Sequence, residues 1–172
     1  MPQGAPLETS VREDQSTELE KTTTIHLSRF GACTYGESEI VRFPWGLPGF
    51  AALRRFLVIS VDGEEGYIWL QSLDDHSVAI PLCDPWSIFE DYEASLPLYA
   101  RQSLEIETAD SFCVMCVLVA RPGAETTINL LAPIVINLET RVGRQVTLEN
   151  QRYSVRTPVI RPAKPAKEVI SS

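Results

Sequence analysis

The stretch Phe43-Pro44-Trp45-Gly46-Leu47-Pro48-Gly49-Phe50 places two prolines and two glycines among four large apolar side chains. Its second half is typical of a type II turn, because Pro48 sets φ at about −65° and Gly49 accepts the positive φ that follows. The aromatic side chains at both ends need burial. We therefore expect a rigid structural corner packed into a core, in preference to a loop that contacts a partner.

On both sides of this corner, apolar residues alternate or form short runs rich in Val, Ile and aromatic residues, with turn residues between the runs. This pattern is typical of short β-strands. The predicted strands cover residues 25–30, 38–43, 56–61, 66–72, 77–82, 104–108, 112–121, 126–131, 133–137, 144–147 and 153–155. With almost no helical periodicity, they indicate an all-β fold, a small antiparallel barrel-like sandwich.

One short helix is expected to interrupt the strands. Asp84 suits the N-cap and Pro85 the first helical position. On a helical wheel one face would be apolar, with Trp86, Ile88, Phe89 and Tyr92, and the other polar, with Ser87, Glu90 and Asp91. Carboxylates in a last turn are unfavourable for the helix, so either a basic partner or a tolerated surface feature would account for them.

The length of 172 residues suits one domain. We predict a disordered N-terminal arm over residues 1–24, a folded unit over residues 25–156, and a basic, proline-rich tail over residues 157–172. With neither a signal peptide nor a long apolar run in the sequence, we expect a cytoplasmic protein that is not bound to a membrane and is a monomer when free.

The charge distribution favours a protein partner over nucleic acid. The net charge of −8 disfavours direct contact with phosphates. Between Arg55 and Arg101 the chain has no Lys or Arg but nine acidic residues: Asp62, Glu64, Glu65, Asp74, Asp75, Asp84, Glu90, Asp91 and Glu93. Because folded domains usually intersperse charges of both signs, this interval predicts a negative face.

The sequence contains no complete catalytic or metal-binding motif. Cys113 and Cys116 form a C-x-x-C, but inside a predicted strand residues three apart point to opposite faces and cannot share a metal or a disulfide. Asp74-Asp75-His76 could bind a metal or move protons, yet a solvated turn is the simpler interpretation. We predict no catalytic residue, no cofactor and no metal.

Five segments together resemble the flagellar assembly factor FliW family. The corner resembles F-x-x-G-[LI]-P-G-F, with Phe43, Gly46, Pro48, Gly49 and Phe50 matching. The others are Trp69-Leu70-Gln71-Ser72-Leu73, the stretch from Asp84-Pro85-Trp86 to Phe89-Glu90-Asp91-Tyr92-Glu93, the segment from Asn129 through Pro133 to Asn137, and Gly143-Arg144-Gln145-Val146. They follow the family's order across roughly residues 25–156. One departure is Pro81, which cannot donate to a ladder, so its strand should lie at an edge or break there.

The resemblance implies a barrel-like protein that is not an enzyme and that binds two proteins. Family members bind CsrA, an RNA-binding translational repressor, and relieve its repression of flagellin mRNA. They also bind flagellin, so that accumulating flagellin withholds the factor from CsrA. Flagellin synthesis would thereby be held in balance.

An acidic face would suit a CsrA surface that is basic because it binds RNA. We expect contacts from seven residues: Glu64, Asp74, Asp75, Asp84, Glu90, Asp91 and Tyr92. The alternative function is a small barrel that holds an apolar ligand. Large side chains such as Phe43, Phe56 and Trp69 favour a filled interior instead.

Overall fold

The computed structural model describes residues 20–63 and 66–160. Within them the chain forms eleven strands, one α-helix and three 3-10 helices. The strands are β1 (Thr23–Leu27), β2 (Gly31–Tyr35), β3 (Val41–Arg42), β4 (Arg55–Ser60), β5 (Tyr67–Ser72), β6 (Ala79–Cys83), β7 (Phe112–Val119), β8 (Thr127–Ile128), β9 (Ile134–Asn137), β10 (Gly143–Gln145) and β11 (Thr157–Pro158). The helices are η1 (Glu37–Glu39), η2 (Pro85–Ser87), α1 (Leu98–Ser103) and η3 (Ala109–Ser111).

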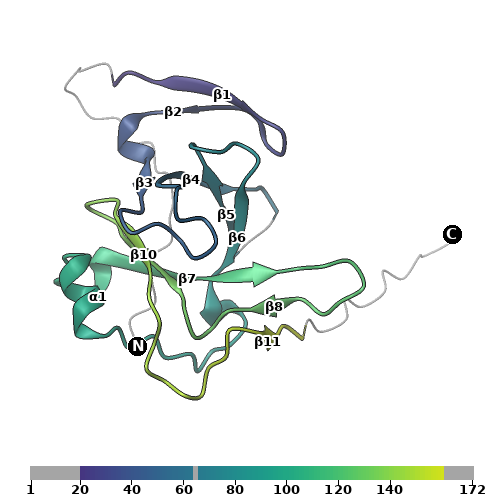
Figure 1. Cartoon of the computed structure of the whole chain (residues 1–172), viewed down its shortest axis with the longest axis vertical. Coiled ribbons are helices and arrows are strands. Elements are labelled where there is room, and N and C mark those ends of the chain that lie inside the picture. The colour runs from purple at the N-terminus through teal and green to yellow at the C-terminus, as the bar shows by residue number, and fades with distance from the viewer. Residues whose placement is uncertain (1–19, 64–65, 161–172) are drawn as a thin grey trace, which may run out of the picture.

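The main sheet is antiparallel and runs in the order β10-β9-β7-β6-β5-β4-β3, with β8 and β11 attached beside β7. A single parallel bridge between Arg42 and Val142 joins the two end strands, so the sheet curls towards a barrel without a continuous closing ladder. The β1–β2 hairpin forms a separate two-stranded sheet at the top of Figure 1. The predicted all-β class with one short helix is confirmed.

Side chains pack on both faces of the sheet. The interior cluster contains Phe43, Phe56 and Leu70, all fully buried, and the rings of Phe43 and Phe56 meet edge to face at 5.2 Å. The second cluster contains Tyr92 and Leu104 and lies under the segment that connects β6 to β7. The interior is thus filled by large side chains, as expected for a structural core.

The strand predictions hold for most of the main sheet and fail at four places. Residues 38–43 form η1 and only the short strand β3, and residues 104–108 form a turn after α1. The strand predicted over residues 153–155 is instead β11 at Thr157–Pro158, and β2 was missed because Gly31 begins it. β1 begins at residue 23 and β11 ends at residue 158. The strands therefore extend beyond both ends of the folded unit that was predicted over residues 25–156. The remaining arm and tail, residues 1–19 and 161–172, lie outside the described residues.

The helix was predicted at the wrong place. Asp84 does cap a helix, because its carboxylate accepts from the Trp86 N–H at 3.0 Å, but the helix is the single 3-10 turn η2. The α-helix of the structure is α1, which begins after Pro97. The chain after η2 is held by side-chain contacts to the sheet, and the macrodipole argument for Glu90 and Asp91 therefore does not apply.

Pro81 lies where the sheet changes its pairing. It is opposite Trp69 in the β5–β6 ladder, while β6 pairs with β7 only at Leu82 and Cys83. The first half of β6 thus has no β7 partner in its ladder. This agrees with the prediction of an edge or a break at this proline.

Candidate partner-binding surfaces

The corner from Phe43 to Phe50 is only partly structural. The Phe50 N–H donates to the Leu47 carbonyl at 2.8 Å, and Gly49 has φ of +82°, which confirms the type II turn. Phe43 is fully buried, but Trp45 is 47% exposed and Phe50 38% exposed. The expectation that the aromatic side chains at both ends are buried holds for Phe43 and was wrong for Phe50.

The predicted acidic residues do not form one face. Asp74 and Asp75 lie in the loop between β5 and β6, whereas Asp84, Glu90 and Asp91 follow the other end of β6. These two groups are separated by the length of the β5–β6 hairpin. Glu64 lies outside the described residues, although Gly66, at the end of the same loop, accepts from the Asp84 N–H at 2.9 Å.

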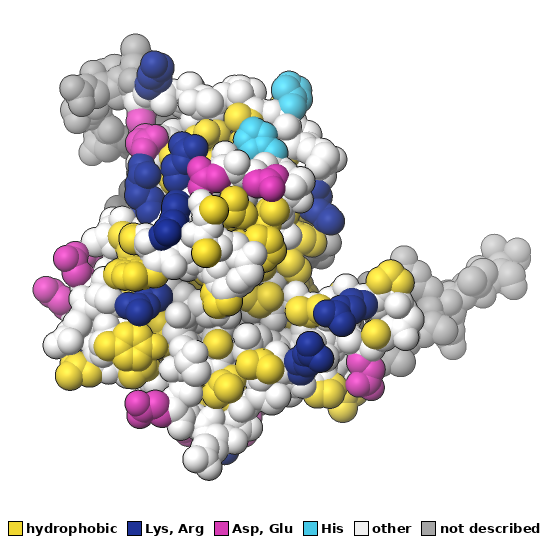
Figure 2. Space-filling model, in the orientation of Figure 1, with side chains coloured by type: hydrophobic (Ala, Val, Ile, Leu, Met, Phe, Trp, Pro, Cys, Tyr) yellow, Lys and Arg dark blue, Asp and Glu magenta, His cyan; other side chains and the backbone are white. Residues whose placement is uncertain are grey.

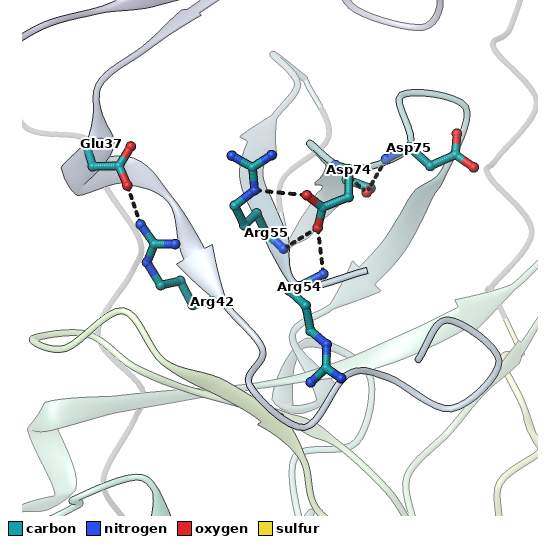
Figure 3. A network of polar contacts seen from close by, with 7 residues as sticks. Glu37, Arg42, Arg54, Arg55, Asp74 and Asp75 are labelled. Atoms are coloured by element: carbon teal, nitrogen blue, oxygen red, sulfur yellow. Dashed lines mark hydrogen bonds and ion pairs between the residues drawn. The ribbon is translucent and has the colours of Figure 1, made fainter. Parts of the chain in front are cut away.

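Asp74 is occupied by contacts within the protein (Figure 3). Its carboxylate accepts from the backbone N–H groups of Arg54 and Arg55 at 2.7 and 2.9 Å, and pairs with the Arg55 guanidinium at 2.9 Å. Burial alone would raise the pKa of Asp74, but these bonds hold it below its ordinary value. Asp74 therefore fastens the start of β4 to the β5–β6 loop and is poorly suited to bind a partner.

The rest of this loop is organised by the Leu-Gln-Ser segment. The buried Gln71 amide donates to the carbonyls of Ser72, His76 and Val78 at 3.0–3.1 Å. Asp75 accepts from the Ser77 backbone and hydroxyl at 2.9 and 2.6 Å, and these bonds lower its pKa. The turn interpretation of Asp74-Asp75-His76 agrees with these contacts. Among the described residues, no group of three His, Cys, Asp or Glu side chains could hold a metal ion.

The acidic end, which we define as Asp84, Glu90 and Asp91, presents its carboxylates more openly. Glu90 and Asp91 are exposed, and Asp91 makes only a long ion pair of 3.6 Å with Arg152, an exposed side chain itself. Asp84 is committed to capping η2. Two of the predicted contact residues are therefore available for a partner at this end.

Tyr92 is not available. Its side chain is 1% exposed, its hydroxyl donates to the Leu130 carbonyl at 2.9 Å, and its ring packs against Trp86 and Tyr153. Burial raises its pKa strongly. The prediction that Tyr92 anchors a partner was wrong, because the segment is not a helix with a free face and its aromatic side chain fills the second core.

Three elements bring exposed aromatic residues together around one arginine. The Arg144 guanidinium of β10 lies 4.6 Å from the ring centre of Trp45 and 4.9 Å from that of Tyr99 in α1. Tyr99 is 46% exposed and its neighbour Leu98 is 70% exposed. We call Trp45, Leu98, Tyr99 and Arg144 the aromatic–arginine surface. The sequence held no local signal for this surface, because its residues come from three separate parts of the chain.

An open hollow of about 430 Å³ adjoins this surface through Pro44 and is lined by Arg42, Arg54 and Arg55. Arg42 pairs with Glu37 (Figure 3). The Arg54 guanidinium donates to the Pro44 carbonyl. Figure 2 shows dark-blue side chains gathered over β3 and the start of β4, and another between yellow side chains beside α1. This part of the molecule is basic, although the chain as a whole is acidic.

The remaining family positions hold turns in place. Asn129 accepts from the Ala132 N–H at 2.9 Å, and the Pro133 carbonyl accepts from the Val146 N–H at 2.9 Å. The buried Asn137 amide donates to the Leu104 carbonyl at 2.8 Å, and its oxygen accepts from the N–H groups of residues 139 and 140. These contacts are within the protein, between turns and the neighbouring backbone.

The cysteines are buried thiols on different faces of β7. Cys113 belongs to the interior cluster and Cys116 to the second cluster, which confirms that they point apart. Burial raises the pKa of Cys113 to about 11 and that of Cys116 to about 12. Both thiols are therefore protonated at neutral pH and unreactive.

No helix in the described part of the chain has the length and apolar character needed to cross a bilayer. The described residues form a small, filled β-fold with exposed carboxylates at the acidic end and exposed aromatic side chains around Arg144. Its class is that of a small all-β domain.

Comparison with known proteins gives the family. The FliW protein family matches residues 24–159. The chain is 39% identical over 131 residues to the flagellar assembly factor FliW of Thermosipho africanus, covering 75% of this chain and 90% of that protein. It is 34% identical over 136 residues to the FliW of Clostridium tetani, covering 78% and 94%. A crystal structure of the flagellar assembly factor FliW superposes with a TM-score of 0.75 at 31% identity, over 81% of this chain and 98% of that one. The chain belongs to the FliW family of flagellar assembly factors.

Proposed function

We propose that this protein binds CsrA and flagellin in the cytoplasm and relieves the repression of flagellin mRNA by CsrA. The observation that carries the proposal is the family match across residues 24–159. The match spans the main sheet from β3 to β11, including the corner from Phe43 to Phe50 and the acidic end. Flagellin synthesis would then respond to the amount of flagellin that is not yet secreted.

The acidic end is our candidate for the CsrA contact. CsrA binds RNA and needs a basic surface for that, so exposed carboxylates can steer it and fix its orientation. Glu90 and Asp91 are exposed, and only Asp91 has a described cation nearby, at 3.6 Å. Glu64 belongs to the same proposal, though it lies outside the described residues. Asp74 and Asp75 are weaker candidates, because their oxygens already accept from Arg54, Arg55 and Ser77.

A double charge reversal tests this candidate. Glu90→Lys with Asp91→Lys should weaken CsrA binding about tenfold or more and lower the association rate at low salt, because steering depends on charge. The matched control is Glu107→Lys with Asp110→Lys, which changes the net charge equally at two other exposed positions. Binding measured by biosensor with salt titration separates the two variants. Equal losses in both would show an effect of net charge alone and would remove the acidic end from the proposal.

The alternative, a small barrel that holds an apolar ligand, is less well supported. Fully buried Phe43, Phe56, Leu70, Leu82 and Ile134 occupy the interior where such a ligand would have to lie. A pull-down of purified CsrA and flagellin with this protein is the direct experiment. Failure to retain either protein would contradict the proposed function.

A further inference from the structure

The aromatic–arginine surface is built from three separate parts of the chain. Trp45 comes from the corner before β4, Tyr99 from α1, and Arg144 from β10, where it lies opposite Val135. The Arg144 guanidinium also donates to the Ser103 hydroxyl at 2.9 Å, so its position is fixed from two sides. The stack holds both rings in place while about half of each ring's surface stays open to solvent.

Such an arrangement keeps apolar ring surface in contact with water, and burying that surface against a partner is favourable. Trp, Tyr and Arg are the side chains most enriched at the energetic centres of protein interfaces. Rings that are already held in place lose little conformational freedom on binding, so more of the contact free energy is retained. Leu98, 70% exposed beside Tyr99, extends the apolar part of the surface.

The charge next to these rings is positive. Arg54 and Arg144 donate to uncharged acceptors, the Pro44 carbonyl and the Ser103 hydroxyl, so these bonds do not neutralise their charges. Arg42 and Arg55 are paired with Glu37 and Asp74 but remain about half exposed. A partner that covers this region therefore gains from carboxylates and loses from lysines or arginines.

We propose that the aromatic–arginine surface and the adjoining arginine hollow bind a protein segment that carries apolar anchor side chains and carboxylates. This inference rests on the proposed function for the identity of the partner. Of its two partners, CsrA has a basic RNA-binding surface that these arginines repel, so the segment belongs to flagellin. The acidic end and this surface then select their partners by opposite signs of charge.

A purely structural role for the stack is the competing explanation, in which Arg144 only fastens α1 to β10. Under that explanation, truncation of the rings lowers stability and leaves both binding constants unchanged. The decisive readout is therefore the affinity for purified flagellin, compared with that for purified CsrA, in variants whose fold is verified by circular dichroism and thermal unfolding.

The first variant is Trp45→Ala with Tyr99→Ala. We expect its affinity for flagellin to fall at least about thirtyfold, as for central interface residues, and that for CsrA to change by less than about threefold. Should this variant unfold, Leu98→Ser gives the same test, since Leu98 is 70% exposed, and about a fivefold loss is expected. Its matched control is Val155→Ser, at an apolar position 51% exposed elsewhere, with no change expected.

The charge of the hollow is tested by Arg54→Glu against Arg121→Glu, an exposed arginine after β7. The first should weaken flagellin binding more at low salt than at high salt, because the lost attraction is screened by ions. The second should change flagellin affinity by less than about twofold.

The outcomes separate the two proposals. Flagellin binding that survives in the folded Trp45 and Leu98 variants overturns the surface assignment and leaves the proposed function standing. Loss of CsrA binding together with flagellin binding overturns the assignment of partners by charge. Failure of the unmodified protein to bind either partner contradicts the proposed function, and the inference falls with it.

Discussion

Gly143 shows how a single residue without a side chain can allow the core to close. A Cβ atom at this position would lie 2.5 Å from the Phe43 ring, a contact that must displace the ring. Its φ is not in the left-handed region, so the requirement is one of space and not of backbone conformation. Gly49 is the opposite case, because its φ is +82° and nothing lies within 4 Å of a built Cβ atom.

Gly143→Ala should therefore destabilise the protein by about 1–3 kcal/mol, the usual cost of overpacking a core. Gly49→Ala should cost about 1–2 kcal/mol through backbone strain alone. Urea unfolding measures both. Phe43→Leu shortens the side chain that Gly143→Ala displaces, so adding it to Gly143→Ala should recover part of the lost stability. Adding Phe43→Leu to Gly49→Ala should recover none. A Gly143→Ala variant as stable as the unmodified protein would contradict the close packing.

Asp74 gives a pH-dependent contribution to stability. Its pKa in the folded protein is lower than its ordinary value, so the charged form stabilises the fold above the ordinary Asp pKa of about 3.9. This stabilisation is lost as the pH falls through the lower, folded-state pKa. The contribution should be fully present at neutral pH.

Asp74→Asn should lower the free energy of unfolding by about 1–2 kcal/mol at pH 7, because the bonds to Arg54 and Arg55 lose their charged acceptor. The difference from the unmodified protein should shrink as the pH falls below about 4 and disappear once the pH is below the lower, folded-state pKa. Thermal unfolding across this pH range measures it, with the exposed Glu107→Gln as a control. A difference that stays constant with pH would exclude the carboxylate as its cause.

At the scale of elements, the segment between β6 and α1 contains the short helical turn η2 and is attached to the rest of the fold by side chains. The Trp86 indole N–H donates to the Tyr92 carbonyl at 2.8 Å, and the Tyr92 hydroxyl donates to the Leu130 carbonyl at 2.9 Å. The Glu93 N–H donates to the Tyr153 hydroxyl at 2.7 Å. Aromatic side chains thus attach this segment to the chain around β8 and β11.

Tyr92→Phe should lower the free energy of unfolding by about 1–2 kcal/mol, because a buried carbonyl loses its donor. For a protein of this size that corresponds to a decrease in Tm of about 2–8 °C. Tyr99→Phe, on a ring 46% exposed, should change Tm little. CsrA and flagellin binding should be unchanged in a folded Tyr92→Phe protein. A selective loss of binding would restore Tyr92 as a contact residue.

The sequence predicted the elements whose pattern is local and missed those that depend on distant contacts. Alternating apolar spacing or short continuous apolar runs located β4, β5, β7 and β9, because their side chains are buried on one face or on both. The wheel over residues 84–93 gave a correct cap and a wrong helix. Apolar spacing there reflects Tyr92 and Trp86 packing on the second core, which the local sequence cannot distinguish from a helical face.

The candidate site was predicted less well for a related reason. Composition revealed an interval without Lys or Arg, but β5 and β6 fold as a hairpin and send its acidic residues to opposite ends. Arg54 and Arg55 border this interval in the chain and return beside Asp74 in space. Trp45, Tyr99 and Arg144 come from three elements, and only the sheet order brings them together.

At the scale of the whole molecule, the net charge of −8 conceals a separation of charge. Exposed carboxylates remain at the acidic end. The arginines lie elsewhere, on β3, at the start of β4 and on β10: Arg42, Arg54, Arg55 and Arg144. A uniform negative surface would attract every basic protein and repel every acidic one. Two surfaces of opposite sign let one small domain discriminate between partners by where each can bind, since the wrong placement costs several kcal/mol of repulsion. Selectivity of this kind requires that the sheet be rigid enough to keep the surfaces apart, which the filled interior around Phe43 and Phe56 provides.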